Sequence, residues 1–488
     1  MSSNRSPRAA TSKSATLRRS AMRAFDEQTA KDLEFDAIRT LLLHHCQNPS
    51  AIARAHALHP MDRQKQWQKE LEQTKEMLEI KREGNGFPAV GCEEIGADNE
   101  RLAVRDSVLD EAGFHRLKTA SLTVNDVIAA LDERESSSPR LVHLASSVHH
   151  TLEIIESIDA VFDAKGQVRS NASAKLIHIR EEMVRLRRAI NRQFLKDLKR
   201  FKERGWLADT NEGFINNRRV LAVNSTHKRK VSGTALGQSK NGSITFIEPA
   251  ANVSMNFEME MLLDDERKEI LRILRALTAQ TRKHLPLFRA YHVLLVELDW
   301  IRAKMQLAVE MEADMPGLRQ DCSFHLIRAY HPLLAMQNKL NGVHTEPQTI
   351  ALSKKGRMLV ISGPNAGGKS IALKTVGLLQ VMLQSGLLVP VHPNSEMGSF
   401  ETILTDIGDN QSIENQLSTY SYRLNRMRSF LEIANAKSLL LLDEFGTGSD
   451  PELGGALAEV FFEELYARKS YAVITTHYAN IKSRAARM

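Results

Sequence analysis

Cysteines and long apolar runs are scarce in this chain of 488 residues. The three cysteines, Cys46, Cys92 and Cys322, lie far apart and lack metal-ligand spacing. We therefore expect reduced thiols in a reducing compartment rather than a disulfide framework or a zinc site. No apolar run approaches the roughly 18 residues of a membrane-spanning helix, and the N-terminus lacks the apolar segment of a signal peptide. The expected location is the cytoplasm.

Charge and hydrophobicity are ordinary, so the composition excludes few classes. Hydrophobic residues make up 42% and charged residues 26%, which is typical of a soluble globular protein. The net charge of +7 permits a polyanionic partner without identifying one. Residues 1–24 contain basic residues but no acid, and this composition predicts a disordered basic tail.

A glycine-rich loop between a strand pattern and a helical pattern is the most informative stretch. Residues 359–361 are apolar and β-prone, residues 363–370 read GPNAGGKS, and residues 371–385 repeat apolar positions with helical spacing. This order is the setting of a phosphate-binding loop, although the letters alone also occur in ordinary glycine turns. Backbone N–H groups and the helix dipole would hold a phosphate. Lys369 would reach the β- and γ-phosphates, and Ser370 would ligate Mg²⁺.

Two further strand patterns end in polar residues with complementary chemistry. Residues 438–442 form a buried-strand pattern followed by Asp443 and Glu444, which alone also fits a strand with acids at its exposed end. After a phosphate loop it indicates a Walker B strand. Asp443 would then hold Mg²⁺ through water, and Glu444 would orient and deprotonate the attacking water. A third strand pattern, residues 471–475, precedes His477, which would donate to a γ-phosphate oxygen at the carboxyl edge of the sheet.

A long helical pattern at residues 173–204 is strongly basic. Its apolar residues follow one stripe, and basic residues cover the other faces. This pattern predicts an arm that packs on one face and presents positive charge on the others. A merely solvated helix face is the alternative explanation.

A small β element with a basic turn separates this helix from a second helical pattern at residues 255–284. Residues 218–223 and 243–247 predict strands, and a glycine-rich stretch covers residues 233–242. Two helices that hold such a tip resemble a lever with a clamp, suited to backbone contacts that ignore nucleic-acid sequence. The candidate contacts are Lys228, Arg229 and Lys230.

The other segments carry less chemistry. Residues 27–160 are mainly helical and contain no catalytic constellation. Short strands and turns are predicted, including residues 330–334 and 349–352, which would flank an adenine ring. Residues 387–391 and 402–405 predict further strands after the phosphate loop.

Four segments together resemble the ATPase of the MutS family. They are the phosphate loop and residues 406–420, 442–451 and 475–478. The residues of these motifs are most similar to those of the second bacterial MutS branch, which lacks a mismatch-reading domain. The likeness is highly specific over about residues 330–481, moderate over the lever and clamp, and weak before about residue 150.

The resemblance implies an ABC-type ATPase that works as a dimer with composite sites. Ser418 and Thr419 match the signature segment that reaches the γ-phosphate held by the other subunit, and His477 matches the switch histidine. The implied cofactors are ATP and Mg²⁺, with Lys369, Glu444 and His477 as catalytic residues and Ser370 and Asp443 as metal ligands. The implied nucleotide-binding residues are Gly363, Pro364, Asn365, Ala366, Gly367, Gly368, Lys369, Ser370, Ser418 and Thr419.

The expected fold is an α/β P-loop ATPase domain of the ABC type at residues 315–488. A helical core at 25–160 and lever helices at 161–314, with a small β-containing clamp tip at about 206–252, would precede it. We expect a homodimeric, ATP-hydrolysing clamp on branched, recombining or other double-stranded DNA, without a membrane partner. Two alternatives stay open: a ribosome-binding ATPase that splits or rescues stalled ribosomes, and a non-catalytic DNA-binding fragment.

Two departures limit what the resemblance implies. The Phe-x-Glu mismatch reader has no sound counterpart, because residues 25–27 match its letters without a preceding domain and residues 461–463 lie in a predicted helix. Mismatch recognition is therefore not expected. The family continues beyond the switch histidine with dimer-forming elements, and this branch with a nuclease-like domain. No nuclease site is expected within these residues.

Overall fold

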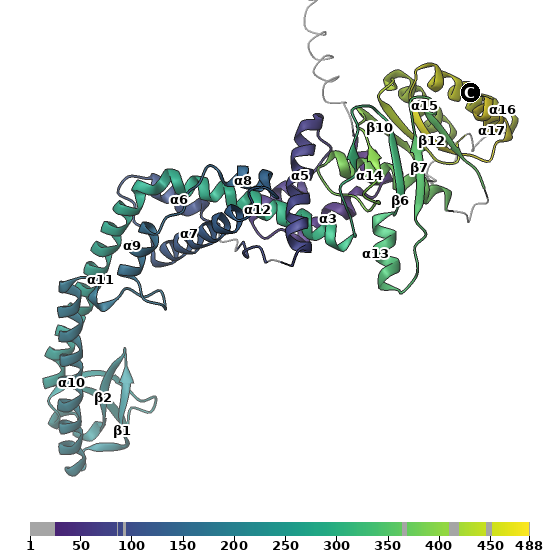
Figure 1. Cartoon of the computed structure of the whole chain (residues 1–488). Coiled ribbons are helices and arrows are strands. Elements are labelled where there is room, and N and C mark those ends of the chain that lie inside the picture. Colours follow the sequence, from purple (N-terminus) through teal and green to yellow (C-terminus); the bar gives the residue numbers. More distant parts are fainter. Residues whose placement is uncertain are drawn as a thin grey trace, which may run out of the picture. The chain divides into compact units, whose positions relative to one another are not determined.

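The protein consists of two compact units that are interleaved in sequence (Figure 1). The first comprises Met1–Cys92, Asp126–His149 and Val293–Met488, and the second comprises Glu93–Asn125 and His150–His292. The computed structural model describes residues 25–487 except for residues 85, 91–93, 364–367, 409–418 and 446–450 and the side chains of residues 419–423 and 451–453. No helix among these described residues is long and apolar enough to cross a bilayer.

Four parallel strands of the first unit carry the predicted motifs. They are β8 (Met358–Ile361), β10 (Thr402–Asp406), β11 (Ser438–Leu442) and β12 (Tyr471–Thr475), in the order β10-β11-β12-β8. Every residue of β11 and β12 is buried, as unbroken apolar runs predict for a sheet covered on both faces. The strands predicted at residues 359–361, 402–405, 438–442 and 471–475 are confirmed. Their carboxyl ends meet at one edge of the sheet.

Helices that follow these strands complete the layer. They are α14 (Lys369–Gln384), α15 (Thr419–Ile433), α16 (Pro451–Ala467) and α17 (Ala479–Arg487). Phe445, Phe462 and Leu465 are at most 2% exposed and belong to the apolar cluster beneath the sheet. In α14, a Cβ at Gly377 would lie 2.3 Å from a methyl group of Leu441. The glycine therefore allows the helix behind the phosphate loop to approach β11 closely.

A second sheet of the first unit differs from the sequence prediction. Its strands are β5 (Gly317–Leu318), β9 (Glu396–Met397), β6 (Phe324–Ala329) and β7 (Gln348–Leu352), in that order. The prediction of a strand at residues 330–334 is wrong, because α13 (Pro332–Leu340) begins there with proline in its first turn, a favoured position. A strand at residues 387–391 is also wrong. Val389 makes only an isolated bridge to Asp314, so this apolar run is buried without strand pairing.

Helices from the N-terminal part of the chain also belong to the first unit, and some of them meet at an ion cluster. They are α2 (Glu27–Asp32), α3 (Phe35–His45), α4 (Pro49–His56), α5 (Gln64–Arg82) and α8 (Pro139–Ala145), joined by the last part of α12 (Leu285–Glu310). The Lys304 side chain is fully buried, and its Nζ lies 2.7 Å from Glu70 Oε2. Arg54 contacts the other carboxylate oxygen at 2.6 Å, and Trp300 Nε1 donates to Oε2 at 3.0 Å.

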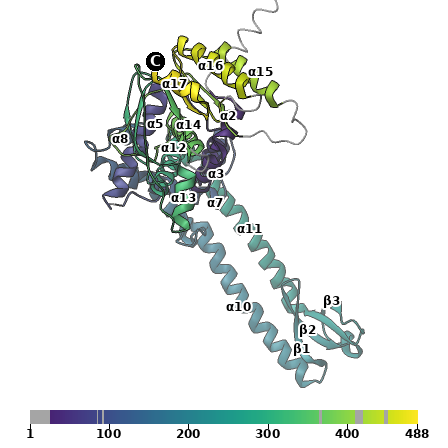
Figure 2. The same ribbon diagram turned by 90° about the vertical axis from the view of Figure 1, so that its right-hand side faces the viewer.

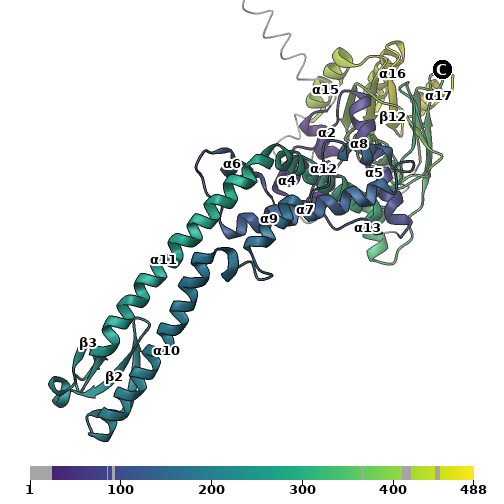
Figure 3. The same ribbon diagram turned by 60° about the vertical axis from the view of Figure 1, so that its left-hand side comes forward.

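Two long helices dominate the second unit (Figures 2 and 3). Helices α10 (Ala174–Glu203) and α11 (Ala250–Thr281) pack against each other, and a small sheet lies where α10 ends and α11 begins. Ser173 caps α10 by accepting a hydrogen bond from the Leu176 amide at 3.0 Å. The predicted apolar stripe of α10 is confirmed by the burial of Ile179, Met183 and Phe194. The unit also contains α6 (Gly96–Ala103), α9 (Glu153–Val161) and the first part of α7 (Glu111–Asp132).

The sheet at the end of these helices has two strands more than the sequence predicted. Its order is β1 (Leu207–Ile215), β2 (Arg218–Asn224), β4 (Ile244–Pro249) and β3 (Gly233–Gln238), with all pairs antiparallel. Strands β2 and β4 were predicted, whereas β3 lies in the glycine-rich stretch. A Cβ at Gly233 would lie 2.0 Å from the carbonyl oxygen of Glu248, so the strand pairing itself requires glycine there.

Candidate nucleotide site and basic tip

The predicted phosphate loop leads into the first turn of α14. Gly368 occupies the N-cap position with φ +73°, a left-handed conformation that glycine adopts without steric cost. Lys369 follows as the first helical residue. Its side chain is buried, and its Nζ donates to the Gly363 carbonyl at 2.6 Å. The other predicted loop residues, Pro364, Asn365, Ala366 and Gly367, lie outside the described residues.

The three predicted catalytic residues come together at the carboxyl edge of the parallel sheet. Lys369 Nζ lies 3.5 Å from His477 Nε2, which follows β12. Because β11 pairs with β12, Asp443 and Glu444 emerge directly beside the strand that leads to the histidine. The sheet thus places a lysine, a histidine and two acids at one edge, where ligands bind in open α/β sheets.

Thr475, the last residue of β12, links the two acids and was not singled out from the sequence. Its fully buried Oγ1 lies 2.5 Å from Asp443 Oδ1 and accepts a hydrogen bond from the Glu444 amide at 2.8 Å. Glu444 has φ +47°, which is uncommon for a residue other than glycine. The sequence holds one signal for this contact, which is a hydroxyl at the end of a buried strand. The sequence does not show which strand lies beside β12, so the partner of the hydroxyl could not be predicted.

A hollow of about 580 Å³ borders the phosphate loop. Gly368 and Lys369 form one wall, and Leu334 of α13 and Ile350 of β7 belong to others. The volume and the apolar walls suit a nucleobase and ribose beside a phosphate site. Segments 330–334 and 349–352 therefore both supply residues to the hollow, the first as a helix rather than a strand. Its remaining lining residues are Asn338, His344, Thr345, Glu346, Gln348, Thr349, Leu359, Ile361, Ile371 and Ala372.

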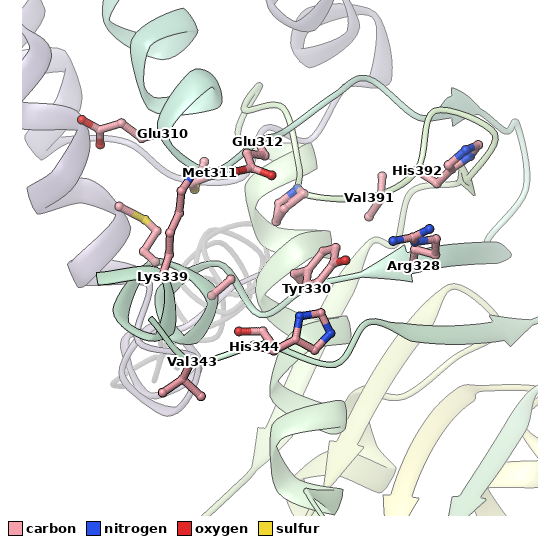
Figure 4. Close-up of a pocket in the computed structure, with 14 residues that line it drawn as sticks. Glu310, Met311, Glu312, Arg328, Tyr330, Lys339, Val343, His344, Val391 and His392 are labelled. Carbon is pink, nitrogen blue, oxygen red and sulfur yellow. Dashed lines mark hydrogen bonds and ion pairs between the residues drawn. The ribbon is translucent and has the colours of Figure 1, made fainter. Parts of the chain in front are cut away.

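A neighbouring hollow of about 500 Å³ uses other residues of α13 (Figure 4). In the close-up, Arg328 and His392 lie at one end and Lys339 and Val343 at the other. Lys339 forms an ion pair with Glu312 at 2.5 Å. None of the described residues of the phosphate loop lines this hollow, whereas Gly368 and Lys369 line the first one.

Helix α15, which follows the predicted signature segment, is anchored to the sheet. Ser418 lies outside the described residues, and Thr419 is described only as the first backbone position of α15. Further along the helix, Arg426 Nε donates to the Thr405 carbonyl of β10 at 3.0 Å. The same guanidinium lies 3.5 Å from Asp32 of α2. Helix α15 is therefore held to β10, the outer strand of the parallel sheet.

The basic tip of the second unit is exposed. Lys228, Arg229 and Lys230 lie in a 3₁₀ turn, Ser225–Lys230, that follows β2. None of the three side chains forms an ion pair within the part of the chain that the structure describes. Lys230 Nζ lies 5.8 Å from the centre of the Trp206 ring, a cation–π geometry that keeps the ammonium at the surface.

The basic helix α10 continues this positive surface. Most of its basic side chains are exposed and lack ion pairs among the described residues, which distinguishes α10 from a helix whose charges are balanced locally. Arg204 stacks on the Trp206 ring at 5.0 Å and joins the helix end to the tip. The exposed basic residues without ion pairs are Arg185, Arg187, Arg188, Arg192, Lys196, Lys199, Arg200 and Lys202 of the helix and its C-cap residue Arg204.

Comparison with known proteins decides the family. Residues 359–488 match the model of MutS domain V. A protein called Endonuclease MutS2 from Clostridium botulinum is 31% identical over 462 residues, which cover 94% of this chain and 58% of the relative. The chain belongs to the MutS family. Proteins of the same description from Levilactobacillus brevis and Streptococcus equi are 30% and 33% identical over the same shares of both chains.

These MutS2 relatives confirm the resemblance seen in the motifs and extend it across both units. The chain spans 58% of the length of these three curated relatives. The domain V match begins inside β8 and includes the phosphate loop, both acids and His477.

The residues around the phosphate loop fit a magnesium ion bound together with a nucleotide. Mg²⁺ prefers oxygen ligands and usually keeps several waters, so one or two protein oxygens suffice. Ser370 supplies a hydroxyl and Asp443 a carboxylate whose Oδ1 is engaged by Thr475. Among the described residues no group of three or more His, Cys, Asp or Glu side chains could hold a metal alone. This donor set is suited to a cation that arrives with phosphate rather than to a permanent metal centre.

Proposed function

We propose that this chain is a P-loop ATPase of the ABC type that acts as a nucleic-acid clamp. The observation that carries the ATPase assignment is the 3.5 Å approach of Lys369 Nζ to His477 Nε2 beside the Asp443–Glu444 pair. The exposed basic residues of α10 and of the tip support the clamp.

Each residue at the sheet edge has a role in the proposed hydrolysis. Glu444 takes a proton from water while the water oxygen attacks the γ-phosphorus and ADP leaves. Lys369 exchanges its contact with the Gly363 carbonyl for β- and γ-phosphate oxygens. His477 donates to a γ-phosphate oxygen. Ser370 and Asp443 would hold Mg²⁺, which would supply neutralisation of the phosphate charge.

The composite site requires a second copy of the chain. By resemblance to the family, Ser418 and Thr419 of one subunit reach the γ-phosphate on the other, and we propose a homodimer on this basis. Arg426 holds α15 to β10, so movement of the signature segment would be transmitted to the sheet. ATP binding would then draw two sheets together and close the clamps around nucleic acid.

Lys369→Ala is expected to reduce ATP hydrolysis by at least about 100-fold, because the phosphates lose the charge that binds and polarises them. The steady-state rate per chain, measured over a series of chain concentrations, checks this result. Lys355→Ala removes an exposed lysine of the same unit and is the matched control. Undiminished hydrolysis by Lys369→Ala would show that the site is misplaced. A rate near zero for the unsubstituted chain at every concentration would favour a non-catalytic binding fragment.

Changing Lys228, Arg229 and Lys230 together to Ala is expected to weaken DNA binding equally for all sequences. The slope of log affinity against log salt should become shallower by about one for each phosphate that the variant no longer neutralises. Titrations of two unrelated duplexes and a branched junction over a range of salt concentrations measure both quantities. A control variant with Lys165, Lys268 and Lys437 changed to Ala loses the same charge away from the tip. A sequence-selective loss of affinity would contradict a backbone-binding clamp.

The nucleic acid on which the clamp closes is proposed to be branched or recombining DNA. Glu444→Gln, expected to bind ATP without rapid turnover, can be offered branched DNA and ribosomes together, with and without ATP. ATP-dependent retention on DNA supports the proposal. ATP-dependent retention on ribosomes alone would replace it by ribosome splitting or rescue.

A further inference from the structure

We propose that Thr475 is a positioning residue that sets both acids at the end of β11 for ATP hydrolysis. The inference rests on the proposed ATPase function and assigns a role to a residue outside the phosphate loop and the acid pair. Thr475 itself touches neither nucleotide nor water in this scheme. It acts through Asp443 and Glu444, which it holds from the neighbouring strand.

The direction of both hydrogen bonds follows from the chemistry of the three groups. The Glu444 amide can only donate, so at 2.8 Å the Thr475 hydroxyl oxygen must be its acceptor. The hydroxyl then has one proton, which it donates to Asp443 Oδ1 at 2.5 Å. One hydroxyl thereby orients the carboxylate that holds the cation and fixes the amide of the general base. Within the described residues Asp443 Oδ2 has no hydrogen bond and is left for the hydrated cation.

The backbone of the general base depends on the same threonine. Glu444 adopts φ +47°, and the amides on either side of its turn are both tied to Thr475. The Glu444 amide binds the hydroxyl, and the Phe445 amide donates to the Thr475 carbonyl at 2.9 Å. Phe445 is buried at 2% exposure and packs beside Phe461, which anchors the chain after the turn. The turn that aims Glu444 is therefore specified from β12.

A valine at this position would match the shape of threonine and favour the strand at least as well. The buried hydroxyl is thus not needed for strand formation or for volume. Its loss would leave the Glu444 amide and Asp443 Oδ1 without their partner while the neighbouring backbone pairing of β11 and β12 stays in place. Asp443 and Glu444 would then sample several orientations.

Thr475→Val is expected to lower kcat by about 10- to 100-fold and to raise the Mg²⁺ concentration for half-maximal rate by about 10-fold. ATP binding in the absence of Mg²⁺ should stay at the unsubstituted level, because Lys369 and the phosphate loop are intact. Thr475→Ser keeps the hydroxyl and should restore both kcat and the Mg²⁺ profile. A purely structural role would predict neither a shift in the Mg²⁺ midpoint nor rescue by serine.

Thr476→Val is the matched control. Thr476 is also fully buried, but its hydroxyl donates to the Phe445 carbonyl at 3.1 Å and contacts neither acid. Its Mg²⁺ midpoint should equal that of the unsubstituted chain. If Thr475→Val fails to fold, as judged by its thermal transition, Thr475→Ala takes its place. The kcat and the Mg²⁺ concentration for half-maximal rate are then compared between Thr475→Ala and Thr475→Ser.

The proposal is overturned if a folded Thr475→Val variant hydrolyses ATP with unchanged kcat and Mg²⁺ midpoint. It is also overturned if Thr475→Ser is folded and binds ATP but is as slow as the valine variant. A different result tests the ATPase assignment itself. If Lys369→Ala hydrolyses ATP like the unsubstituted chain, the proposed site fails, whatever the threonine variants do.

Discussion

Replacing Glu444 by Gln lowers kcat for ATP hydrolysis by about 10²- to 10⁴-fold, the range that a general base contributes. Glutamine keeps the size of the side chain and the left-handed turn but cannot accept the proton of the attacking water. Lys369 and the loop backbone are untouched, so ATP binding should change little. Single-turnover hydrolysis and equilibrium ATP binding, measured on the same preparation, separate the two effects.

Glu464→Gln is the control for this substitution. Glu464 lies exposed on α16, and its side chain has no ion pair among the described residues. Its kcat should match that of the unsubstituted chain. If Glu444→Gln and Glu464→Gln had the same rate, another group would have to serve as the base.

Lys304→Ala is the substitution with the largest expected effect on folding. The variant should lose about 3–5 kcal/mol of unfolding free energy, because it leaves the largely buried Glu70 carboxylate with Arg54 as its remaining ion-pair partner. Lys304 is 1% exposed, and its Nζ also approaches the Gly386 carbonyl just after α14 at 3.4 Å. Chemical denaturation at pH 7 measures the loss.

Matched variants separate this effect from the removal of a surface charge. Lys339→Ala removes one partner of the exposed Lys339–Glu312 pair and should change stability by less than about 1 kcal/mol. The double variant Lys304→Met with Glu70→Gln removes both buried charges and should regain part of the stability lost in Lys304→Ala. Equal losses in Lys304→Ala and Lys339→Ala would contradict the role of the buried cluster.

The ion cluster of Glu70, Lys304 and Arg54 also makes the free energy of unfolding depend on pH. Burial alone would raise the pKa of Glu70, but Lys304 and Arg54 offset this and hold its pKa at about 2. Since the folded pKa lies below the unfolded value of about 4.3, the carboxylate binds fewer protons in the folded state. Its contribution to stability is therefore complete above about pH 4 to 5 and is lost as the pH falls toward 2. Glu70→Gln should flatten the acid side of the stability profile.

Local patterns predicted two fully buried strands and one long helix with a single buried face. The runs that became β11 and β12 are unbroken apolar stretches, and α10 has a cap at Ser173 and one apolar stripe, so little else fits them. The local sequence pattern did not predict a strand that forms because a neighbouring strand supplies its hydrogen-bond partners. Strand β3 has a glycine-rich sequence, and β4 provides the antiparallel partner that makes it a strand. Pro332 was a missed start signal for α13.

The site residues also divide into those that the sequence predicted and one that only the structure revealed. Lys369, Asp443, Glu444 and His477 were named from spacing, because a phosphate loop and a strand that ends in acids carry their chemistry in consecutive residues. Thr475 could not be named in this way. Its partner Asp443 is 32 residues away in sequence, and the two side chains meet only because β12 lies beside β11.

The sequence by itself determined the chemical groups of this protein: a phosphate loop, two acids after a buried strand, a histidine after another, and a basic helix with a basic tip. Each is a local pattern of residue type and spacing. Only the tertiary structure decided which of them meet. Lys369 and His477 are 108 residues apart in sequence and come within 3.5 Å because β12 inserts between β11 and β8. Strand order depends on how distant helices and strands bury their apolar faces together, and no local pattern records it.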